Sequence, residues 1–120
     1  MAASAAYAAV PVPERVQTGF ATPSRNIVCN AGPYHGGYVT VCTVFTAATA
    51  KGQKLWSMRT SGRVSVGFLM ANVATDYPVL RYGRSWSWHG IRCSSQRAGL
   101  TCRNRSGHGF VLSRKSQRVF

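Results

Sequence analysis

Three histidines, His35, His89 and His108, each precede a glycine and are the side chains best suited to acid–base chemistry. His108 lies between two glycines, which would leave its imidazole open to a substrate as a general base. A catalytic imidazole is ordinarily oriented by a carboxylate, and the chain has only two acids, Glu14 and Asp76. In the alternative structural reading, the glycines form a tight bend and the imidazole bonds a carbonyl. If His108 is catalytic, the protein would be a secreted basic hydrolase or a nuclease-type toxin, which we keep as an alternative to the binding function expected below.

The four cysteines, Cys29, Cys42, Cys93 and Cys102, include no C-x-x-C pair, and the histidine spacings match no metal motif. We expect no metal and no other cofactor. An even number of cysteines in a small chain indicates two disulfides and an oxidising compartment. Four cysteines allow three pairings, of which Cys29–Cys42 with Cys93–Cys102 would each join neighbouring strands.

The charge balance is strongly basic, with 15 Lys and Arg against two acids and a net charge of +13. Such a charge attracts anionic partners, although it also serves solubility alone. The partners that we expect are an acidic protein in a secreted or surface assembly, or an anionic polymer such as teichoic acid or nucleic acid.

Aromatic and basic residues alternate in the segment 81–92. Trp86 and Trp88 are two residues apart and would share one face of a strand. They would either stack on bases or sugars between phosphate-binding arginines, or pack over the edge of the core beneath arginine stems. The candidate binding residues are Arg81, Arg84, Trp86, Trp88, Arg92, Arg97, Arg103, Arg105 and Arg114.

Short strands separated by turn residues must position these side chains. The β-branched and aromatic segments lie at 26–29, 38–45, 63–70, 90–93, 100–104 and 109–113. Their spacing predicts an all-β fold, a small antiparallel sandwich or barrel-like domain of short hairpins stapled by two local disulfides.

Three turns are predicted between these strands. Gly32-Pro33 and Gly36-Gly37 are turn dipeptides. Arg97-Ala98 would form the centre of a type I turn, with Gly99 in the left-handed αL position of a bulge.

The N-terminal residues 1–16 are small, apolar and proline-containing. Ala6-Tyr7-Ala8 is typical of the end of a secretory signal. We expect a flexible arm at 1–16, a signal-peptide remnant or tether, and a single disulfide-bonded β domain at 17–120. Such an arm can also add to a partner's sheet as a strand. No stretch has the length of a transmembrane helix, and we expect a secreted protein.

Three segments carry a family resemblance: F-x-S/T-P-S-x-N-I-x-C at 20–29, L-x-Y-G at 80–83, and C-x8-C-x-N-x-x-G-H-G-F-x-L-S-R at 93–114. Over about 20–120 the chain resembles a family of small secreted actinobacterial domains of unknown function. The resemblance implies secretion and local disulfides, and it supplies no activity. We expect a secreted, non-enzymatic binding or assembly module whose basic, aromatic-bearing surface engages an acidic partner.

Overall fold

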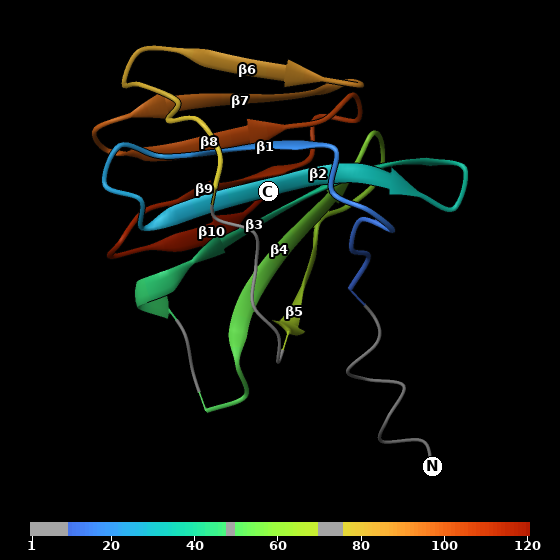
Figure 1. The fold of residues 1–120 in the computed structure, drawn as a ribbon, viewed down its shortest axis with the longest axis horizontal. Helices are drawn as coiled ribbons and strands as arrows, with labels where there is room; N and C mark the ends of the chain where they lie inside the picture. Colours follow the sequence, from blue (N-terminus) through green and yellow to red (C-terminus); the bar gives the residue numbers. More distant parts are fainter. Residues whose placement is uncertain (1–9, 48–49, 70–75) are drawn as a thin grey trace.

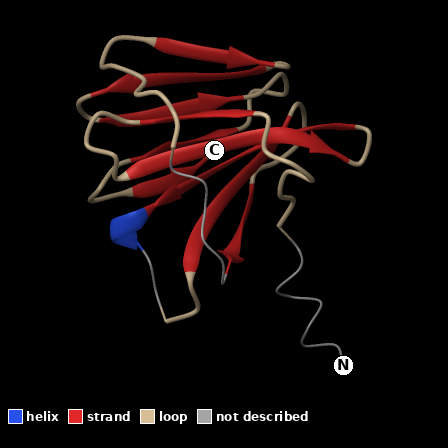
Figure 2. Cartoon of the chain, in the orientation of Figure 1, coloured by secondary structure: helices blue, strands red, loops and turns tan. Residues whose placement is uncertain are grey.

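Both halves of the chain fold as antiparallel meanders, in which each strand pairs with its neighbours in sequence. The computed structural model describes residues 10–47, 50–69 and 76–120. The first sheet contains β1 (Thr18–Ala21), β2 (Ile27–Tyr34), β3 (Gly37–Val44), β4 (Gln53–Arg59) and β5 (Ser65–Leu69), in that order. The second contains β6 (Ser85–Trp88), β7 (Ile91–Gln96), β8 (Gly99–Arg103), β9 (Gly109–Leu112) and β10 (Gln117–Val119), with β6 and β10 at its edges. Figure 2 shows the two sheets and the short 3-10 helix η2 (Phe45–Ala47).

The predicted all-β sandwich is confirmed, because the two sheets pack face to face around one core. Alternate residues of each sheet point into this core, and their burial is the main stabilising contribution. The core residues are Phe20, Ile27, Cys29, Cys42, Val44, Trp56 and Met58 of the first sheet and Ile91, Cys93, Leu100, Cys102, Phe110 and Leu112 of the second. No helix among the described residues is long and apolar enough to cross a membrane.

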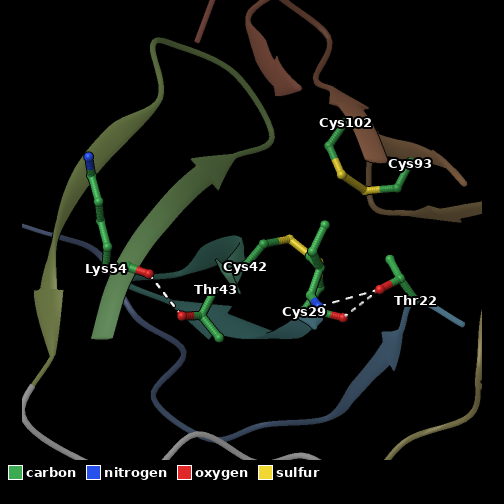
Figure 3. The surroundings of a disulfide bond; sticks show 8 residues. Thr22, Cys29, Cys42, Thr43, Lys54, Cys93 and Cys102 are labelled. Atoms are coloured by element: carbon green, nitrogen blue, oxygen red, sulfur yellow. Dashed lines mark hydrogen bonds between the residues drawn. A yellow bond between two sulfur atoms is a disulfide. The ribbon is translucent and has the colours of Figure 1, made fainter. Parts of the chain in front are cut away.

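Both disulfides lie inside the core, as Figure 3 shows. Cys29 and Cys42 are direct partners across β2 and β3, and Cys93 and Cys102 are direct partners across β7 and β8. All four cysteines are 0% exposed. The predicted local pairing is confirmed, and each bond links two strands of a single sheet.

Two hairpins turn through a histidine and a glycine. His35 and Gly36 have φ of 45° and 78°, and His89 and Gly90 have φ of 46° and 83°. Positive φ at both central residues defines the type I′ turn, whose twist matches that of paired strands. These histidines are therefore exposed turn residues at the ends of β2 and β6.

The prediction of a turn at Gly32-Pro33 is wrong, because both residues lie within β2. Proline is tolerated there because β1 pairs with β2 only as far as Ala31. The missing N–H of Pro33 therefore leaves no strand partner unbonded.

The β7–β8 hairpin closes through Arg97 and Ala98, with Gln96 paired to Gly99. Both central residues have a negative φ, which agrees with the predicted type I turn. The prediction of an αL conformation at Gly99 is wrong, since its φ is 149°. A Cβ at Gly99 would lie 2.7 Å from the carbonyl oxygen of Leu112, so the close approach of β9 requires glycine there.

Residues 10–16, which fall within the predicted arm, lie across the outer face of the first sheet. Ser57 Oγ donates a hydrogen bond of 2.6 Å to the carbonyl oxygen of Pro11. A Cβ at Gly67 would overlap the Val10 side chain. Apolar residues of this outer face are buried: Val28, Val39, Val41 and Leu55. Residues 1–9 lie outside the described residues, and the division into arm and domain stays a prediction.

The turns gather at two opposite ends of the sandwich, right and left in Figure 1. The histidine end comprises residues 35–36, 60–63, 89–90 and 104–108. The Tyr82 end comprises residues 22–26, 81–84, 97–98 and 113–116.

Asn104 ties the two sheets together at the histidine end and is 5% exposed. Its Nδ2 donates to the carbonyl oxygens of Arg59 (3.0 Å) and Gly62 (2.8 Å), which flank the β4–β5 turn. Its Oδ1 accepts from the N–H groups of Ser106 (3.0 Å) and His108 (3.2 Å). One amide side chain therefore joins a turn of the first sheet to a loop of the second.

Candidate anion-binding surface

The outward face of the second sheet carries arginines and hydroxyl groups. Arg92 and Arg103 are direct partners across β7 and β8, and Ser94 faces Thr101 beside them. These residues alternate with the core cysteines of the same strands, so their side chains point away from the core. We call this surface the outer arginine face and define it by Ser85, Arg92, Ser94, Thr101, Arg103, Arg118 and Phe120.

An aromatic ring lies between two arginines of this face. Arg118 is paired with Val111 on the outward side of β9 and β10. The guanidinium carbons of Arg103 and Arg118 lie 5.1 Å and 5.8 Å from the centroid of the Phe120 ring. Such cation–π contacts hold both guanidinium groups in place. Neither Arg118 nor Phe120 is among the binding residues predicted from the sequence, because β10 contains only one β-branched residue, Val119, and gives no strand signal of its own.

The outer arginine face brings like charges together and contains no Asp or Glu side chain. Arginines directly opposite each other on neighbouring strands, such as Arg92 and Arg103, repel each other. Arg92 Nη2 donates a hydrogen bond of 3.3 Å to Ser85 Oγ, a hydroxyl of the same face. A depression of about 390 Å³ lies between Arg92 and Arg103. Its lining, which contains no carboxylate, is Gly90, Arg92, Ser94, Thr101, Arg103 and Asn104. An anion bound here would relieve the repulsion and accept hydrogen bonds from the hydroxyl groups.

The two tryptophans share one face of β6, the inward face. Trp86 and Trp88 pair with Cys93 and Ile91, whose side chains lie in the core. The Trp86 ring centroid is 5.1 Å from that of Phe20. Trp86 therefore packs against the core, and Trp88 stacks beside it on the same face at 6.1 Å between ring centroids, so both rings lie on the opposite face of the sheet from Arg92.

The structure separates the remaining candidate arginines from this face. Arg81, Arg84, Arg97 and Arg114 lie at the Tyr82 end. Arg105 lies at the histidine end, where its N–H bonds the Thr60 carbonyl oxygen at 3.0 Å. The nine predicted binding residues thus occupy different parts of the surface and do not form one site.

His108 has a backbone partner. Its Nδ1 lies 3.3 Å from the main-chain oxygen of Phe120. The Glu14 carboxylate accepts instead from the N–H of His35, at 2.7 Å. Within the described ranges, no group of three or more His, Cys, Asp or Glu is arranged to hold a metal ion. The catalytic use of His108 stays a prediction that this geometry does not favour.

A family match covers the part of the chain that bears this surface. Residues 56–120 match the profile described as "Family of unknown function (DUF6636)". This range begins within β4 and includes β5 and the whole second sheet, whereas the Cys29–Cys42 hairpin precedes it. No curated protein and no solved structure matches the chain.

Proposed function

Because the chain belongs to DUF6636, a family of unknown function, we propose a function from its surface chemistry. The protein is a non-enzymatic binding or assembly module, and its outer arginine face engages an acidic partner. The observation that carries this proposal is the row of Arg92, Arg103 and Arg118 on one face of a sheet with an internal disulfide, with the Phe120 ring beside Arg103 and Arg118. An acidic protein of a surface assembly and an anionic polymer, teichoic acid or nucleic acid, both supply the complementary charge.

We propose that the protein acts outside the cell. Its two disulfides are typical of proteins from oxidising compartments. The resemblance to secreted actinobacterial domains supports the same location. In that setting, fixed arginines meet anionic envelope polymers and the acidic surfaces of secreted proteins.

The test measures the affinity for labelled polyphosphate and polyglutamate chains as salt rises from about 50 mM to about 200 mM. If three arginines each contact a phosphate, and the slope per contact equals that of single-stranded nucleic acids, polyphosphate affinity should fall about 20-fold. An affinity that does not change with salt would contradict a charge-led interaction.

Matched variants locate the contact. Arg103→Gln with Arg118→Gln removes two charges from the outer arginine face, whereas Arg15→Gln with Arg63→Gln removes two exposed charges elsewhere. The first pair should weaken binding several-fold more than the second. Equal losses would mean that net charge alone attracts the polymer, and the face would then have no special role.

A further inference from the structure

A second cationic site lies at the Tyr82 end, where the two sheets meet. A cavity of about 190 Å³ opens between the β1–β2 loop of the first sheet and the β7–β8 and β9–β10 turns of the second. All of its lining residues belong to the three segments 20–29, 80–83 and 93–114, which carry the family resemblance and are far apart in the sequence. The lining is Thr22, Ser24, Asn26, Ile27, Tyr82, Gln96, Arg97, Gly99, Leu100, Ser113 and Arg114.

The cavity has an apolar inner wall and a cationic rim. Ile27 and Leu100 are 5% and 0% exposed and belong to the core. Arg97, Arg114 and Tyr82 are exposed. The lining contains no carboxylate, so two guanidinium groups face one small space without a counter-charge from its walls.

Tyr82 and Arg97 are held in place before any ligand arrives. The Arg84 N–H bonds the Arg81 carbonyl oxygen at 3.0 Å, and Gly83 has a φ of 83°, as the third residue of a type II turn requires. The Gly83 N–H then bonds the Ser95 carbonyl oxygen at 2.7 Å and fixes this turn to β7. The Arg97 guanidinium carbon lies 5.1 Å from the Tyr82 ring centroid, so the ring restricts the arginine.

Arg114 is also carried by a closed turn. The Ser113 N–H bonds the Ser116 carbonyl oxygen at 2.8 Å, and the Ser116 N–H bonds Ser113 Oγ at 3.1 Å. Gln117 Nε2 bonds the Ser113 carbonyl oxygen at 2.7 Å. The closed turn fixes the backbone that carries Arg114, so a ligand does not have to order this loop when it binds, which favours affinity.

The polar groups of the β1–β2 loop are used within the first sheet. Thr22 Oγ1 bonds both the N–H and the carbonyl oxygen of Ile27, each at 3.3 Å. Asn26 Nδ2 bonds Thr46 Oγ1 at 3.1 Å. By contrast, the guanidinium groups of Arg97 and Arg114 have no hydrogen-bond acceptor among the described residues. The arginines therefore supply the charged donors that the cavity leaves unused, next to the uncharged Gln96 amide and Tyr82 hydroxyl of the same lining.

The volume indicates the size of the group that the cavity itself can hold. An apolar cavity of about 150 Å³ holds one benzene molecule, so 190 Å³ accommodates a ring-sized apolar body and one small polar group. A carboxylate is the smallest anion that matches the planar arginine fork, and together with one ring it stays within this volume.

We propose that this cavity binds a carboxylate carried on a ring-sized apolar body. Arg97 and Arg114 bind the carboxylate, while Ile27, Leu100 and the Tyr82 ring contact the apolar body. The carboxylate can come from a free aromatic acid or from the C-terminal residue of a peptide. This site is separate from the outer arginine face and does not depend on the function proposed for it.

The test titrates the folded protein with benzoate and benzamide, which differ in charge but hardly in shape. Backbone amide shifts report where each probe binds. Benzoate should bind in a saturable way and shift the amides of Gly83, Gly99 and Ser113, and benzamide should bind at least tenfold more weakly. Equal affinity for the two probes, no saturation by benzoate, or shifts confined to other parts of the chain would overturn the proposal.

Variants separate this site from general charge attraction. Arg97→Gln and Arg114→Gln should each weaken benzoate binding at least fivefold, and Arg92→Gln, on the outer arginine face, should leave it unchanged. An equal loss in all three would reduce the effect to net charge and overturn the proposal. A second titration, with N-acetylphenylalanine and its amide, then tests whether the ligand is the C-terminal residue of a peptide. Tighter binding of the acid than of benzoate identifies a peptide C-terminus as the source, and weaker binding identifies a free aromatic acid.

Discussion

Replacing Asn104 should cost far more stability than replacing a second buried asparagine of the same fold. The Asn104→Ala variant loses two donated and two accepted hydrogen bonds. Each bond contributes about 1 kcal/mol net. Because the backbone around Gly62 and Ser106 is exposed, water replaces part of the loss, and we expect a cost of about 3 kcal/mol. Asn26 is the matched control, since it is also buried and makes only two such bonds, both to Thr46.

The assay is equilibrium unfolding in urea, followed by the fluorescence of tryptophan, of which Trp56 is 2% exposed. With an m-value of about 1.5 kcal/mol/M, the midpoint should fall by about 2 M in Asn104→Ala. In Asn26→Ala the fall should be about half as large. Native-state hydrogen exchange of the Ser106 and His108 amides should speed up only in the Asn104 variant.

Asn104→Asp isolates the two donated bonds. This variant keeps an acceptor for Ser106 and His108 but removes the donors and turns a charge toward two carbonyl oxygens. Its cost at neutral pH should equal or exceed that of Asn104→Ala. If Asn104→Ala cost no more than Asn26→Ala, the idea that this side chain fastens the two sheets would be refuted.

Two further substitutions test the packing of the sandwich. Thr40 is 0% exposed and its hydroxyl has no hydrogen-bond partner among the described residues. Thr40→Val should therefore stabilise the fold by about 1 kcal/mol and raise Tm by about 4 °C. A lower Tm of the variant in a calorimetric scan would show that the Thr40 hydroxyl has a hydrogen-bond partner after all. Gly109→Ala should prevent folding because its Cβ would overlap the carbonyl oxygen of Cys102, whereas Gly107→Ala, with a φ of 81° and open space around it, should cost about 1 kcal/mol. Similar soluble yield and melting for both alanine variants would contradict the close approach of β8 and β9.

The sequence predicted the strands that are rich in β-branched and aromatic residues and missed those that are not. β3 and β9 are strongly apolar, and their alternation is visible. β10 has a glutamine and an arginine among its three residues, and β6 alternates serine with tryptophan. These strands form because neighbouring strands supply partners, which is a tertiary effect that no local pattern records.

The outer arginine face depends on β10, one of the strands that the sequence did not predict. Without β10, neither Arg118 nor Phe120 could be placed beside Arg103. The cavity at the Tyr82 end brings Arg97 and Arg114 of the second sheet next to Ile27 of the first. This arrangement depends on how the two sheets are stacked, which the residue spacing within a single hairpin does not indicate. By contrast, the disulfide pairing was predictable because each bond closes a single hairpin.

The position of the disulfides also sets the order in which this molecule can mature. Thiol–disulfide exchange requires a thiolate to reach a sulfur atom, and in the finished sandwich all four cysteines are 0% exposed. Oxidation must therefore be completed while the hairpins are still apart, and closure of the sheets then seals both bonds. Once it is sealed, and where the reductant attacks faster than the sheets close again, the lifetime of the protein in a reducing medium equals the interval between openings of the sandwich. That lifetime is a kinetic property governed by the unfolding rate rather than by the reduction potential of either bond.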